Sequence, residues 1–145
     1  MATAANRRET SVRSLDLARV LLIESDVASR LTLQTLLRAG GYSVDVAGSA
    51  AEGLSKLDDG IYELVLSDED MESPEAGRGV LAYARGKEYK PATALVTAQR
   101  DGKGVTSWKD RQMVVGTNDA SYLLGKVADL IGIRASRRAE RALRQ

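Results

Sequence analysis

Several acidic residues follow a short apolar run, a place where carboxylates can bind or react with a ligand. The run Leu64–Leu66 leads through Ser67 into Asp68, and Asp70 comes soon after. An uninterrupted apolar run is typical of a strand buried on both faces, as in parallel sheets covered by helices. In open parallel sheets the binding crevice lies beyond the carboxyl ends of the strands. Asp68 is therefore a candidate site residue, unless it only ends the strand and caps a turn.

A second apolar run, Arg19–Glu24, also ends in an acid. Ser25 and Asp26 follow directly, and both residue types are common N-caps of helices. Residues 27–39 then place leucines at helical spacing and stop at a pair of glycines, which predicts a helix. A strand, an acidic end and a helix are thus expected in succession.

The composition limits the chemistry that the chain can perform. Its 145 residues are 43% apolar and 28% charged, which is ordinary for one globular domain. Cysteine and histidine are absent, which excludes disulfides, thiol nucleophiles, ordinary zinc sites and imidazole catalysis. No apolar run approaches the roughly 20 residues that span a bilayer, and no signal peptide is recognisable. We therefore expect a cytoplasmic protein without a membrane partner.

Strand and helix patterns alternate along the chain. Further strands are predicted at residues 42–47, 92–97 and 113–116, and further helices at residues 49–60, 76–85 and 120–131. The segment 99–110 is charged and interrupted by glycines, so any helix there is expected to be short or weak. This alternation implies an α/β three-layer sandwich with a parallel sheet. We expect a flexible leader at residues 1–17, one domain at 18–132 and an arginine-rich tail at 133–145.

Three motifs, in this order, resemble those of the receiver domains of bacterial response regulators. They are Val20-Leu-Leu-Ile-Glu24-Ser-Asp26, Leu64-Val-Leu-Ser-Asp68-Glu-Asp-Met71 and Ala94-Leu-Val-Thr97-Ala98. The resemblance covers about residues 18–132. It implies a flavodoxin-like receiver fold, in which a five-stranded parallel sheet has the strand order 2-1-3-4-5.

The resemblance also implies a role for each matching residue. Asp68 takes the place of the aspartate that accepts a phosphoryl group, and Glu24 takes the place of the first of two acids that hold Mg²⁺. Thr97 takes the place of a hydroxyl that contacts the phosphoryl oxygens. Asp26 or Asp70 could help to bind the metal ion, because Mg²⁺ prefers oxygen ligands.

The chain departs from the family pattern around the same site. Ser25 stands where the second acid belongs, Gly116 where a lysine belongs, and Met113 where the family often has a switching aromatic residue. A hydroxyl in place of a carboxylate weakens Mg²⁺ binding, so we expect weak binding at most and no required cofactor. Without the lysine, a transferring phosphoryl group lacks its fixed cation. Phosphorylation of Asp68 is therefore expected to be lost or weakened.

The acids of this site would crowd together without a neighbouring ammonium group. The group consists of Glu24, Asp68 and Asp70. Like charges at close range raise the pKa of at least one carboxyl group. We expect a pocket that is partly protonated near neutral pH, or one in which an arginine or a bound cation relieves the repulsion.

Five arginines give the chain a basic end. Residues 134–145 contain these five and a single glutamate and so carry +4, which leaves −3 on the rest of a chain whose net charge is +1. The arginines are Arg134, Arg137, Arg138, Arg141 and Arg144. If the tail is helical, most of them form a stripe that could bind an anionic ligand such as a cyclic dinucleotide. The tail could equally stay solvated, and nucleic acid is not an expected partner because the stripe lacks aromatic residues.

The sequence therefore predicts a stand-alone pseudo-receiver, a signal-transduction module that acts by protein–protein interaction and is not an enzyme. Within the family, the fourth helix, fifth strand and fifth helix carry output, so we expect a protein partner on that face and on the arginine tail. Two alternatives stay open. The chain could be a phosphorelay receiver that a histidine kinase phosphorylates on Asp68, or a sensor that binds a small anionic ligand through its tail.

Overall fold

The described residues of the chain alternate between strands and helices, as the sequence predicts. The computed structural model describes residues 17–69, 71–97, 106–109, 112–116 and 119–144. The strands are β1 (Arg19–Ile23), β2 (Ser43–Ala47), β3 (Leu64–Asp68), β4 (Ala92–Thr97), β5 (Thr106–Lys109) and β6 (Gln112–Gly116). The helices are α2 (Val27–Ala39), α3 (Ala50–Asp59), α4 (Pro74–Arg85) and α5 (Ala120–Leu143).

The strands form one six-stranded sheet in the order β2-β1-β3-β4-β6-β5. All neighbours from β2 to β6 pair in parallel, which gives the predicted order 2-1-3-4-5 with β6 as its fifth strand. The flavodoxin-like α/β fold is thus confirmed. The strand order reverses between β1 and β3, and Asp68 ends β3 beside this switch point.

The predicted number of strands was wrong by one, because β5 adds an antiparallel edge strand next to β6. The sequence predicts at most a short helix in residues 99–110, but residues 106–109 form this strand. Thr106 and Trp108 are residue types that favour extended backbone, and the edge of β6 offers hydrogen-bonding partners. In the described part of the chain, the expected partner face therefore carries a strand where the family has its fourth helix.

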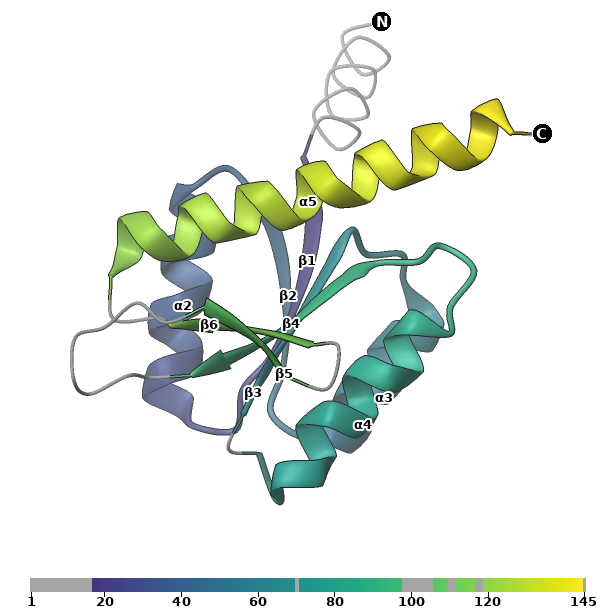
Figure 1. The fold of residues 1–145 in the computed structure, drawn as a ribbon. Coiled ribbons are helices and arrows are strands. Elements are labelled where there is room, and N and C mark those ends of the chain that lie inside the picture. Colours follow the sequence, from purple (N-terminus) through teal and green to yellow (C-terminus); the bar gives the residue numbers. More distant parts are fainter. Residues whose placement is uncertain (1–16, 70, 98–105, 110–111, 117–118, 145) are drawn as a thin grey trace, which may run out of the picture.

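The sheet separates two apolar layers, because successive residues of a strand point to opposite faces. Val20 and Leu22 of β1 belong to the cluster formed with α2 and α5, whereas Leu21 and Ile23 belong to the cluster formed with α3 and α4. All four side chains are fully buried. Figure 1 shows the matching layers, with α2 and α5 on one side of the sheet and α3 and α4 on the other.

The last helix is longer than the sequence predicts. Instead of ending near Ile131, α5 continues to Leu143 and contains 24 residues. Its first half packs on the sheet through Leu123 and Leu130, whereas its second half is largely exposed and extends past the sheet (Figure 1). Gly132 does not end the helix, because the alanines and arginines that follow have high helix propensity. The predicted boundary between domain and tail therefore falls inside one continuous helix.

Two predicted features lie outside the described part of the chain. Of the predicted leader, residues 1–17, only Leu17 is described, and Asp70 is also not described. Among the residues that are described, no helix has both the length and the apolar content that a membrane span requires.

Candidate functional site

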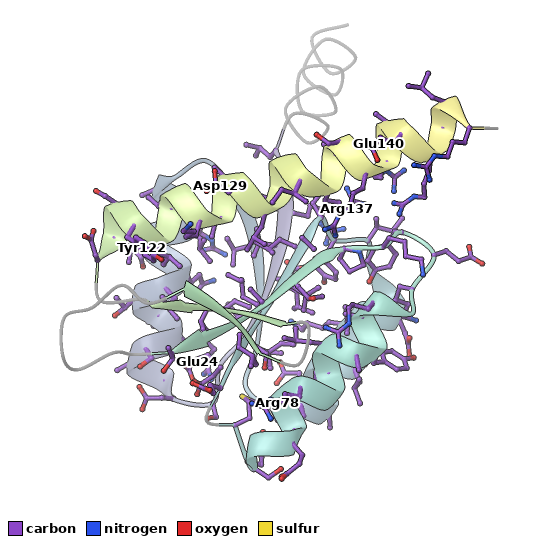
Figure 2. The ribbon with its side chains drawn as sticks, in the orientation of Figure 1. Glu24, Arg78, Tyr122, Asp129, Arg137 and Glu140 are labelled. Carbon is purple, nitrogen blue, oxygen red and sulfur yellow. The ribbon has the colours of Figure 1, made fainter. Side chains whose placement is uncertain are left out.

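The carboxyl ends of β1, β3 and β4 border a pocket of about 220 Å³. Glu24, Asp68 and Thr97 all line it, so the structure brings these three predicted site residues together. The pairing of β3 with β4 explains why Asp68 and Thr97 lie close together, since Asp68 lies opposite Val96, the residue before Thr97. The other lining residues are Ala28, Ser29, Thr32, Leu33 and Val96. Figure 2 shows Glu24 at this end of the sheet, close to α2.

Glu24 is a buried acid whose charge is opposed by its surroundings. Only 5% of its surface is exposed. Burial raises the pKa of Glu24 to about 7, and its hydrogen bond with Asp68 and the nearby charges of Asp68 and Asp26 act in the same direction. The backbone N–H of Asp26 donates to Glu24 Oε2 at 3.2 Å and opposes this increase. The pKa of Glu24 is therefore raised, as expected, but mainly by burial and only secondarily by the neighbouring acids. Glu24 can hold a proton toward the Asp68 carboxylate near neutral pH.

Asp26 has a structural task at the start of α2. It is the N-cap residue, and its carboxylate accepts a hydrogen bond from the Ser29 backbone N–H at 2.8 Å. This bond lowers the pKa of Asp26. Asp26 and Ser25 are exposed, and neither lines the pocket. No three acids of the described residues lie close enough together to form a metal site, so Mg²⁺ binding stays a prediction.

The pocket lacks a cation among its described lining residues. Gly116 lies opposite Thr97 in the pairing of β4 with β6, so it occupies the same edge of the sheet. Since glycine has no side chain, this position supplies no ammonium group. Met113 lies opposite Ala94, further back along the same pair of strands. Two of the departures from the family pattern therefore lie on the strand that neighbours Thr97.

Two charged residues outside the predicted set hold the segments around the pocket. Arg30 donates from Nη1 to the backbone carbonyl of Glu24 at 2.9 Å. Glu72 accepts hydrogen bonds of 3.3 Å from the Ala50 backbone N–H at the start of α3. The first contact joins residues six positions apart across the start of α2. The second contact joins residues 22 positions apart, for which the sequence carries no signal.

Gly77 allows α4 to approach the end of β3 closely. A Cβ atom at Gly77 would lie 2.7 Å from the carbonyl oxygen of Asp68 and 3.1 Å from Ser67 Oγ. Because the first of these atoms belongs to the backbone, Gly77→Ala is expected to push α4 away from Asp68. We expect this to lower the free energy of unfolding by about 1–2 kcal/mol. Urea denaturation followed by circular dichroism measures the change.

Gly79 provides a matched control in the same helix. A Cβ atom there would meet no atom within 4 Å. Gly79→Ala is therefore expected to raise the free energy of unfolding by about 0.5–1 kcal/mol through its higher helix propensity. Effects of the same sign and size in the two variants would contradict a special role of the close approach at Gly77.

The predicted arginines occupy different surroundings. Arg134, Arg137 and Arg141 line a second pocket, of about 250 Å³, at the amino-terminal end of β4. Arg138 lines a neighbouring hollow together with Arg134, and Arg144 is the C-cap residue of α5. The helical stripe that the sequence suggests therefore does form, but only part of it borders the second pocket.

Known proteins that are similar to this chain are found by comparing their solved structures with its fold. No protein-family model matches the chain, and no curated protein matches it by sequence. A CheY-like response regulator receiver domain protein from Methanospirillum hungatei JF-1 is 22% identical, with a TM-score of 0.67, covering 84% of this chain and 99% of that one. A response regulator receiver protein from Sinorhizobium medicae WSM419 is 19% identical, with a TM-score of 0.68 and coverages of 83% and 98%.

The response regulator TrrA from Thermotoga maritima, solved in complex with Mg²⁺–BeF, is 29% identical to this chain. Its TM-score is 0.65, and the match covers 79% of this chain and 99% of TrrA. In all three comparisons nearly the whole of the solved chain is matched, so the likeness concerns a complete domain.

Proposed function

We propose that this chain is a receiver-like signalling module that acts by binding a protein partner, with phosphorylation of Asp68 lost or weakened. Its likeness to solved receiver domains of response regulators supports this proposal. The observation that carries the proposal is the acid pair in the pocket. Glu24 is buried and hydrogen-bonded to Asp68, and no described lining residue is a cation. We propose that the module needs no cofactor and catalyses no reaction of its own.

The electrostatics of the pocket support a weakened reaction. Phosphoryl transfer to Asp68 would add negative charge beside Glu24. In the family, Mg²⁺ and a lysine balance this charge, and such contacts provide most of the catalysis of phosphoryl transfer. Here Ser25 and Gly116 stand at the corresponding positions, and the carboxylate of Asp26 caps α2. The reaction would therefore proceed without its main electrostatic support.

The proposed partner surface is formed by β6, the edge strand β5 and α5. This surface corresponds to the face that the fourth helix, fifth strand and fifth helix form in the family, with β5 at this edge of the sheet. An edge strand presents unpaired backbone groups with which a strand of a partner can pair. Chemical crosslinking of a bound partner tests this placement, and crosslinks confined to α2 and α3 would contradict it.

Intact-protein mass spectrometry after incubation with acetyl phosphate and Mg²⁺ tests the loss of phosphorylation. We expect the wild-type protein to keep its mass, like an Asp68→Asn control treated in parallel, because none of the described residues that line the pocket supplies a balancing cation. A gain of one phosphoryl group in the wild-type protein, absent from the control, would overturn the proposal.

A working phosphorelay receiver, phosphorylated on Asp68 by a histidine kinase, is the second candidate. It is favoured by the shared pocket of Glu24, Asp68 and Thr97, which has the parts of a phosphoryl site apart from the missing ligands. The similar TrrA structure contains Mg²⁺–BeF. The same mass measurement separates the two candidates, because only the second predicts a modified wild-type protein.

A further inference from the structure

Cationic side chains from separate elements meet in the 250 Å³ pocket, which we name the arginine pocket. They are Arg85, Lys90, Arg134, Arg137 and Arg141. Arg85 ends α4 and Lys90 precedes β4, whereas the other three repeat along α5 at spacings of three and four residues. Figure 2 shows Arg137 and Glu24 toward opposite ends of the strands, so the arginine pocket is separate from the Asp68 site.

Hydrogen bonds to neutral groups hold some of these cations in place. Arg134 donates from Nε to the Lys90 carbonyl at 2.9 Å and from Nη2 to the Tyr89 carbonyl at 2.6 Å. Arg85 donates from Nη1 to Thr93 Oγ1 at 3.2 Å. Within the described residues, none of the pocket cations forms an ion pair with a carboxylate. In this part of the chain their charges are therefore positioned without a direct ion pair.

Repulsion between arginines and backbone strain at Lys90 both occur beside the arginine pocket. Burial lowers the pKa of Arg134, and the charges of Arg138 and Arg141 lower it further, whereas the charge of Glu63 acts in the opposite direction. Like charges three or four residues apart destabilise a helix. Lys90 has a φ of 45°, a left-handed conformation that is unfavourable for residues other than glycine. Repulsion between cations and backbone strain in one region indicate a function there, and a bound anion would reduce the repulsion.

The remaining walls indicate which kind of anion fits. Pro91, Ala92, Leu130 and Ile133 contribute apolar surface beside the cations, and Thr93 contributes a hydroxyl. The volume of about 250 Å³ is at the small end of ligand pockets, which usually measure roughly 300–1,000 Å³. This size favours one phosphorylated group with a modest organic part. Guanidinium groups match phosphate oxygens in a two-point geometry, so phosphate is the anion that they recognise best.

We propose that the arginine pocket binds a small phosphate monoester, with the phosphate held by Arg137 and Arg141 and the organic part resting on the apolar wall. Neither of these arginine side chains forms a hydrogen bond to another described residue, so both can turn toward a ligand. Such a ligand would bind next to α5, which belongs to the proposed partner surface. The site itself does not depend on the state of Asp68.

Isothermal titration calorimetry of the full chain with adenosine 5′-monophosphate, inorganic phosphate and adenosine tests the proposal. We expect the nucleotide to bind most tightly, inorganic phosphate to bind more weakly, and adenosine not to bind. This order follows because the charge carries recognition and the apolar wall adds to it. Failure of both anions to bind, or equal binding of adenosine and its monophosphate, would overturn the proposal.

Two double variants with equal charge loss separate a pocket from a generally basic helix. Arg137→Gln with Arg141→Gln removes cations that line the pocket, whereas Arg138→Gln with Arg144→Gln removes the same charge from the same helix outside it. We expect the first pair to weaken nucleotide binding at least about tenfold and the second less than about threefold. Equal losses, or binding of a long polyanion such as RNA alone, would indicate unspecific attraction and contradict the pocket.

Discussion

Ser25→Asp combined with Gly116→Lys is expected to make Asp68 an efficient phosphoryl acceptor. The new aspartate adds a second carboxylate beside Glu24, which strengthens Mg²⁺ binding. The new lysine stands at the end of β6, opposite Thr97 in the sheet, where it can supply a fixed cation. Single contacts of this electrostatic kind change rates by about 10²–10³-fold. The double variant should therefore react with acetyl phosphate at least about 100-fold faster than the wild-type protein, as followed by intact mass over time.

The single variants and the same double variant with Asp68→Asn complete this experiment. Each single variant is expected to react only slightly faster than the wild type, because the metal ion and the ammonium group stabilise the same transferring oxygens and act as a unit. The variant that carries Asp68→Asn should not be modified at all. If the double variant binds Mg²⁺ more tightly by calorimetry but still does not react, the acid pair itself blocks transfer, and the missing ligands are not the cause.

The central part of the fold could be predicted because its signals are local. Strands buried on both faces appear in the sequence as uninterrupted apolar runs, as in β1 and β3. The capping pattern at Ser49 and Glu52 marks the start of α3, and the Ser49 side chain does accept from the Glu52 backbone N–H at 3.1 Å. The strand β5 could not be predicted in this way, because it depends on pairing with β6 and its segment has no apolar periodicity.

The acidic site could be predicted in outline because parallel strands end at one edge of a sheet. This topology brings Glu24, Asp68 and Thr97 together. The task of Asp26 could not be decided from the sequence, because a helix cap and a metal ligand both require a short acid. The arginine pocket also could not be predicted from the sequence, because its contacts join Arg134 to Lys90, which lie 44 positions apart in the chain.

Glu24→Gln is expected to stabilise the protein above pH 7. The pKa of Glu24 is about 7 in the folded protein, against an ordinary value of 4.5, so between these values the folded state holds a proton that the unfolded state has released. The free energy of unfolding of the wild type therefore falls as the pH rises from about 4.5 to 7. Linkage limits the loss to about 3 kcal/mol, and we expect about 2 kcal/mol because solvent reaches part of the pocket. Glutamine does not ionise and can still donate to Asp68.

Chemical denaturation at pH 5 and pH 8 measures this effect. The two proteins should differ by less than about 1 kcal/mol at pH 5, where the folded state of both carries a neutral side chain at position 24 and only the unfolded wild type has begun to ionise. The variant should have the clearly larger free energy of unfolding at pH 8. Asp26→Asn is the control, because it removes an exposed charge nearby and asparagine can still cap α2. If this control gives the same gain at pH 8, general repulsion between acids explains the effect. If only Glu24→Gln does so, the burial of Glu24 beside Asp68 is the cause, and the pocket keeps this acid at the expense of stability near neutral pH.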